Sequence, residues 1–107
     1  MKANPAITLS EVQSDIVCTI LANRAHMIGP IKVFGSRATR RARSGSDLDL
    51  VFYPPVSERD LTELWVAFEE SDLPITVDLI AWDKITSQRL RDEIVRHAVP
   101  LFEEAAA

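Results

Sequence analysis

The chain has 107 residues, of which 47% are apolar and 26% charged, and this is the balance of one ordinary globular domain over residues 1–107. Its net charge of -4 argues against a dedicated nucleic-acid-binding protein, and no apolar run approaches the ~20 residues that a membrane-spanning helix needs. The N-terminus lacks the apolar core of a signal peptide, and the single cysteine cannot form an internal disulfide, so we expect a cytoplasmic protein.

The first predicted element is a helix over residues 8–29. Apolar residues recur in it at a spacing of four, which gives the helix one apolar face. Two capping boxes are available at its start, Thr8 with Glu11 or Ser10 with Gln13. Gly29-Pro30 is expected to stop it.

The rest of the chain alternates between short strands and amphipathic helices. Strands are predicted at residues 31–34, 48–53 and 75–82, helices at 57–70 and 87–98, and a short final strand or coil at 101–104. The order helix, strand, strand, helix, strand, helix favours an α+β fold. We expect a small mixed β-sheet of three or four strands with helices packed mainly on one face.

Two aspartates begin the strand at residues 48–53. Residues i and i+2 of a strand point the same way, so Asp47 and Asp49 are expected on one side while Leu48 and Leu50 face the core. Two such carboxylates repel each other unless a cation lies between them, and hard oxygen ligands suit Mg²⁺. Taken alone, the Asp-x-Asp pair is a weak signal, and an ordinary solvated strand start is the commoner interpretation.

Gly35 and Ser36 follow the strand at residues 31–34 and are expected to open a short helical turn. Backbone N–H groups at such a junction can bind phosphate, and glycine permits its close approach. Four arginines follow, at positions 37, 40, 41 and 43, and could add charge-assisted contacts. The alternative is a plain turn with a solvated loop, which we expect for at least two of the arginines.

Asp78 lies in the middle of an otherwise apolar predicted strand. A carboxylate is costly to bury without a partner, so Asp78 is either exposed at an edge or paired. If its strand lies beside residues 48–53, Asp78 joins the carboxylates of Asp47 and Asp49.

The combination of Gly-Ser, the ten residues 37–46 and Asp-x-Asp on a strand resembles the signature of the nucleotidyltransferases related to DNA polymerase beta. The short length and GSRA…SDLDL make the chain most similar to the minimal nucleotidyltransferase (MNT) group, and the resemblance covers almost the whole chain. It implies one or two Mg²⁺ ions on a catalytic, metal-binding set. That set is Asp47, Asp49 and Asp78, and the nucleotide phosphates would lie on Gly35, Ser36 and Arg37.

One position departs from the family pattern. The family often has glycine where this chain has Arg40. If the backbone there is left-handed, an arginine is strained by roughly 1–2 kcal/mol.

Minimal nucleotidyltransferases are commonly paired with a HEPN-domain protein, an RNase-like toxin. The resemblance therefore implies transfer of AMP from ATP to a tyrosine hydroxyl of a HEPN toxin, with this chain as antitoxin in a hetero-oligomer. The alternative is a non-catalytic antitoxin that neutralises its partner by occlusion. Modification of a small molecule is a third hypothesis, against which the absence of an acceptor domain argues.

Overall fold

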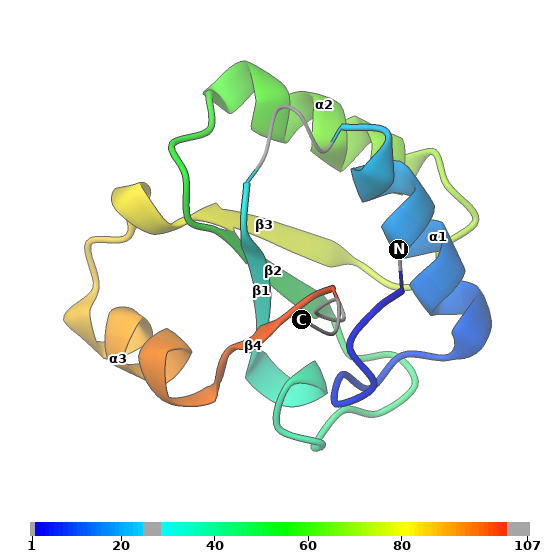
Figure 1. The fold of residues 1–107 in the computed structure, drawn as a ribbon, viewed down its shortest axis with the longest axis horizontal. Helices are drawn as coiled ribbons and strands as arrows, with labels where there is room; N and C mark the ends of the chain where they lie inside the picture. The colour runs from blue at the N-terminus through cyan, green and yellow to red at the C-terminus, as the bar shows by residue number, and fades with distance from the viewer. Residues whose placement is uncertain (1, 25–28, 103–107) are drawn as a thin grey trace, which may run out of the picture.

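The computed structural model describes residues 2–24 and 29–102 (Figure 1). Its elements are α1 (Glu11–Ala22), β1 (Ile31–Phe34), β2 (Leu48–Phe52), α2 (Glu58–Glu69), β3 (Val77–Ala81), α3 (Gln88–His97) and β4 (Val99–Pro100). Two single 3-10 turns follow strands, η1 (Gly35–Arg37) and η2 (Trp82–Lys84). No helix in the described residues combines the length and the apolarity that crossing a membrane requires.

The four strands form one mixed sheet in the order β3-β2-β1-β4. β2 pairs in parallel with β3, whereas β1 is antiparallel to both β2 and β4. The predicted mixed sheet is confirmed, with β3 and β4 at its two edges. A short final strand or coil was predicted at residues 101–104, but the final strand lies at Val99–Pro100, where it pairs with β1, and residues 103–104 lie outside the described residues. Proline is tolerated there because an edge strand has one side free of ladder hydrogen bonds.

Alternation along β2 divides the core between the two faces of the sheet. Leu48, Leu50 and Phe52 are fully buried in the larger core, together with residues from α1 and α2. Val51 faces the other way and packs with Ile94 of α3 in a smaller core. Figure 1 shows α1 and α2 together on one side and α3 on the other, which confirms helices mainly on one face.

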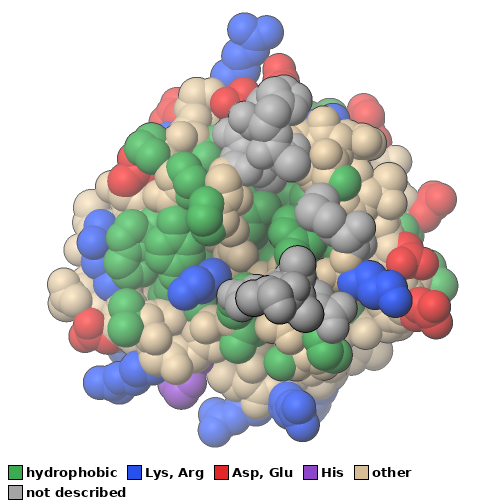
Figure 2. All heavy atoms as spheres, viewed as in Figure 1, with side chains coloured by type: hydrophobic (Ala, Val, Ile, Leu, Met, Phe, Trp, Pro, Cys, Tyr) green, Lys and Arg blue, Asp and Glu red, His purple; other side chains and the backbone are tan. Residues whose placement is uncertain are grey.

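The smaller core continues to the surface as a stack of aromatic and cationic side chains. The rings of Tyr53 and Trp82 stack at 5.3 Å between centroids, with Lys32 over Tyr53 and Arg91 over Trp82. Figure 2 shows apolar side chains gathered on this side of the molecule, near η2. Because the two cations lie over the ring faces, the stack is stabilised by cation–π attraction.

Each α-helix begins at a serine that accepts a hydrogen bond from the backbone three residues on, at Ser10, Ser57 and Ser87. In α1 the second predicted capping box is the one formed, since Ser10 and Gln13 bond reciprocally. The predicted stop at Gly29-Pro30 is wrong, because α1 ends at Ala22. Arg24 donates two hydrogen bonds to carbonyls in the last turn of α1, from its backbone N–H to Leu21 and from its side chain to Ile20. These carbonyls are therefore satisfied without a glycine to cap the end of the helix. Residues 25–28 lie outside the described residues.

Candidate active site

Two carboxylates meet where β2 and β3 run side by side. Asp49 and Asp78 are direct partners in the parallel register, so both side chains leave the same face of the sheet. This is the arrangement that the sequence predicted on condition that the two strands were neighbours. Asp49 is half-buried and Asp78 is exposed.

The surroundings of Asp49 oppose its ionisation. Burial is the largest cause, followed by a hydrogen bond with Asp78 and the negative charges of Asp78 and Asp47, and together they raise the pKa of Asp49 to about 6. Desolvation and like charge both disfavour a carboxylate, and a cation between the carboxylates would reverse the second effect.

Asp47 lies outside the strand register that pairs Asp49 with Asp78. It is exposed and precedes β2, yet its charge still acts on Asp49. Within residues 2–24 and 29–102, no group of three His, Cys, Asp or Glu side chains is arranged to hold a metal ion. The structure therefore brings Asp49 and Asp78 together but does not gather all three predicted ligands.

Gly35 begins the turn after β1 and lies against the side chain of Asp49. Its φ is +73°, and a Cβ placed on it would lie 2.5 Å from Oδ2 of Asp49. Both the left-handed backbone and the close approach require glycine. Ser36 follows within η1, and Thr39 fixes the turn by donating from its backbone N–H and its hydroxyl to the Gly35 carbonyl. Sequence analysis did not single out Thr39, which no motif marked.

Arg37 is placed differently from its predicted role beside the nucleotide. Its side chain is 2% exposed, and its guanidinium donates five hydrogen bonds to backbone carbonyls. The acceptors are the carbonyl oxygens of Thr8, Arg43, Ser44 and Ser46. Burial lowers the pKa of the guanidinium and nearby Asp47 opposes that effect, so the charge is retained. In this structure the Arg37 side chain braces the loop and does not face a phosphate.

The other three arginines of the loop are exposed, at positions 40, 41 and 43. Arg40 has a φ of 61° and is the one non-glycine residue with a positive φ in the described part of the chain. The backbone at this position is thus left-handed, which is the condition under which the sequence predicted strain at Arg40.

A basic pocket lies beside the Gly35 turn. It encloses about 390 Å³ and is lined by Ala38, Thr39, Arg41, Glu93, Arg96 and His97. Among the described residues the only ion pair within 4 Å joins Arg59 to Glu63, so Arg41 and Arg96 have no such carboxylate partner. Sequence reasoning missed Arg96 because only the folded chain brings the end of α3 to the loop.

Comparison with known proteins identifies the family. Residues 17–106 match the family model described as Polymerase beta, Nucleotidyltransferase. The chain belongs to this nucleotidyltransferase family. The membership agrees with the Gly-Ser turn and the strand carboxylates that the fold brings together.

The chain is similar to three known proteins that are informative about this nucleotidyltransferase. It is 42% identical over 76 residues to a probable protein adenylyltransferase, MntA, of Haemophilus influenzae; the match covers 66% of this chain and 62% of MntA, and thus less than two thirds of that relative's length. A solved candidate minimal nucleotidyltransferase is 31% identical, with a TM-score of 0.62 over 84% of this chain and 92% of the other. The fold also matches a complex of tri-AMPylated Shewanella oneidensis HEPN toxin with MNT antitoxin, at 18% identity and a TM-score of 0.63, over 90% of this chain and 74% of that chain.

Proposed function

We propose that this chain is a Mg²⁺-dependent protein adenylyltransferase that moves AMP from ATP to a tyrosine hydroxyl of a HEPN-domain toxin and thereby acts as its cytoplasmic antitoxin. The observation that carries the proposal is the Asp49–Asp78 pair held against the Gly35 turn. The family membership supports nucleotidyl transfer. The similarity to the probable protein adenylyltransferase MntA supports a protein as acceptor, and the similarity to the complex of AMPylated HEPN toxin with MNT antitoxin supports a HEPN toxin as partner.

The carboxylate pair fits Mg²⁺ by its chemistry. This ion commonly takes one or two protein carboxylates and completes its shell with phosphate oxygens and water. Asp49 and Asp78 supply two such groups. The pKa of Asp49 is raised first by burial and then by contact with Asp78, and a bound cation would relieve the like-charge part of the second cause. Asp47 adds negative charge beside them. An ion bound there would neutralise charge that develops on the triphosphate.

The residues around the pair have distinct parts in the transfer. The acceptor oxygen forms a bond to the α-phosphorus, the bond from that phosphorus to the bridging β-oxygen breaks, and pyrophosphate leaves. Asp78 is the exposed member of the pair, so it is the carboxylate that can receive the hydroxyl proton. Gly35 and Ser36 would hold the phosphates through the turn, and Arg41 and Arg96 offer the cations that buried Arg37 does not.

The test is transfer of label from α-labelled ATP to a HEPN-domain partner in the presence of Mg²⁺. We expect Asp49→Asn and Asp78→Asn to lower the rate by at least about a hundredfold, the usual contribution of a positioned proton-transfer or charge-stabilising group. Asp72→Asn, which removes an exposed carboxylate after α2, is the matched control and should retain full transfer. Full transfer in both site variants would refute the assignment.

A non-catalytic antitoxin is the second candidate, and the left-handed Arg40 favours it because a strained phosphate loop would slow transfer. Neutralisation of the toxin by the double variant Asp47→Ala plus Asp49→Ala would establish occlusion. Loss of neutralisation together with loss of transfer would establish the enzyme.

A further inference from the structure

The two edges of the sheet are protected to different degrees. β4 contains two residues, one of which is Pro100, and proline and short length both discourage the pairing of a further strand. β3 has five residues, VDLIA, without proline or lysine. Within the described residues no strand pairs with its outer edge.

The backbone of β3 presents free hydrogen-bonding groups along this edge. Leu48 donates from its N–H to the carbonyl of Thr76, so Thr76 and every second residue after it bond to β2. The N–H and C=O groups of Val77 and Leu79 therefore point outward. These groups form a ladder that an extended peptide can join.

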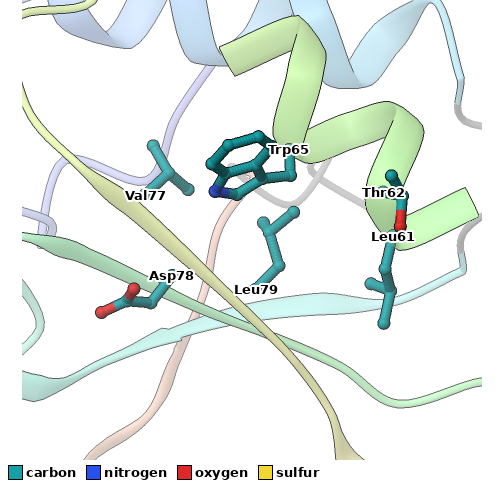
Figure 3. Close-up of a pocket in the computed structure, with 6 residues that line it drawn as sticks. All are labelled: Leu61, Thr62, Trp65, Val77, Asp78 and Leu79. Atoms are coloured by element: carbon teal, nitrogen blue, oxygen red, sulfur yellow. The ribbon is translucent and has the colours of Figure 1, made fainter. Parts of the chain in front are cut away.

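A pocket lies on one side of the same edge. It encloses about 340 Å³ and is lined by Leu61, Thr62 and Trp65 of α2 and by Val77, Asp78 and Leu79 of β3. Trp65 is 51% exposed, although an indole of this size is usually well covered. Figure 3 shows Trp65 on the same side of β3 as Val77 and Leu79, whereas the carboxylate of Asp78 points to the opposite side.

We infer that the acceptor protein binds as an added strand on the outer edge of β3, an inference that rests on the proposed function. Side chains of an added strand alternate between the two faces. One residue would then fill the Trp65 pocket, and the next would reach the face of Asp78 and Asp49, where transfer takes place. The occupant is an extended segment in which an apolar residue adjoins a tyrosine, without acidic neighbours that the site carboxylates would repel.

Ordinary protection of the edge is a simpler explanation for Trp65, since a bulky side chain can cover a strand from the helix above it. It leaves two observations without a reason. The pocket beside Trp65 stays open, and Asp78 is among its lining residues, although the Asp78 carboxylate proposed to receive the acceptor proton lies on the opposite side of β3.

The test uses the full chain labelled with ¹⁵N and the blocked peptide acetyl-Lys-Leu-Tyr-Leu-Lys-amide, with Mg²⁺ and ATP added in separate steps. We expect peptide-dependent shifts in the amides of Val77 and Leu79 and in the indole of Trp65. Trp65→Ala should weaken peptide binding about tenfold, as for a central aromatic contact. Val95→Ala, which truncates a 73% exposed residue of α3, is the control and should bind normally.

A second peptide, methylated on the backbone nitrogens of its three central residues, cannot complete the ladder and should cause no shifts at β3. Absence of shifts at β3 with millimolar unmodified peptide would overturn the inference, and so would equal binding of the methylated peptide. The same spectra separate the two proposals. Shifts of Gly35 and Asp49 on adding Mg²⁺ and ATP report the nucleotide site, whether or not the peptide binds.

Discussion

The side chain of Asp49 lies in a setting that opposes its negative charge. Its pKa is raised from 3.8 to about 6, first by burial and then by contact with Asp78. Between those two pH values the folded protein binds more protons than the unfolded chain, so the contribution of Asp49 to stability falls as pH rises from about 4 to about 6. Without metal, Asp49→Asn should therefore match the wild type at pH 4 and exceed its free energy of unfolding at pH 7. A gain on the order of 1 kcal/mol is expected after solvent screening of a half-exposed group.

Urea unfolding at several pH values in the presence of a chelator measures this difference. Asp72→Asn, at an exposed position, is expected to show no such trend. Adding Mg²⁺ and ATP should reverse the order of stability, because ligands that bind only the folded wild type stabilise it alone. An Asn variant that is less stable than the wild type at pH 7 without metal would show that the charge of Asp49 is well compensated within the protein.

Arg40 is held in a left-handed backbone conformation that a residue with a Cβ disfavours. Its left-handed conformation costs roughly 1–2 kcal/mol, whereas a glycine in its place would add roughly 0.5–1 kcal/mol of unfolded-state entropy. The difference predicts that Arg40→Gly raises the free energy of unfolding by about 0.5–1 kcal/mol. Arg41→Gly, at a neighbouring exposed position without a positive φ, should lower it. Equal losses in the two variants by chemical denaturation would show that Arg40 is not strained.

At the scale of elements, local patterns account for most of what the chain forms. Each predicted strand and helix from residue 31 to residue 98 is present within two residues, because apolar periodicity and serine caps act over a few positions. The end of α1 was not predictable in this way. It depends on how the Arg24 side chain folds back onto Ile20, and no local motif encodes that contact. The position of β4 depends likewise on its partner β1.

The capping box of α1 gives a prediction at this scale. Ser10→Ala removes the acceptor for the Gln13 N–H, a contact of 3.1 Å, and should lower the free energy of unfolding by about 1 kcal/mol. Thr19→Ala, at an exposed position inside the same helix, should be neutral or slightly stabilising because alanine has the higher helix propensity. Thermal unfolding followed by circular dichroism compares the two. Equal effects would mean that the cap contributes nothing beyond helix propensity.

At the scale of the whole molecule, the site arises from contacts between distant segments. The sequence predicted the Asp49–Asp78 meeting only as a condition on strand order, and the sheet supplies that order. The basic pocket of Arg41 and Arg96 and the buried position of Arg37 were not predictable, since both depend on which backbone segments fold together. A guanidinium can donate to a phosphate or to a cluster of carbonyls, so the residue type alone cannot decide between them.

The buried side chain of Arg37 connects the segment before α1 to the loop that precedes β2. Both segments depend on this one side chain, so we expect a substitution at Arg37 to destabilise the fold. Its side chain bonds to the Thr8 carbonyl at 2.7 Å, and its own carbonyl accepts from the Thr8 N–H at 2.9 Å. Lysine would keep the charge but cannot direct five donors at four carbonyls. Arg37→Lys should therefore lower the free energy of unfolding by about 2–4 kcal/mol, because buried carbonyls lose charge-assisted partners.

The matched control is Arg43→Lys, since the Arg43 side chain is exposed in the same loop. It should leave stability unchanged, and the comparison by urea unfolding separates the two possible roles of Arg37. If Arg37→Lys is stable but binds ATP more weakly, then Arg37 binds the nucleotide phosphates, as the sequence predicted. An unstable variant that still binds ATP under native conditions would establish Arg37 as the brace that holds the loop between η1 and β2.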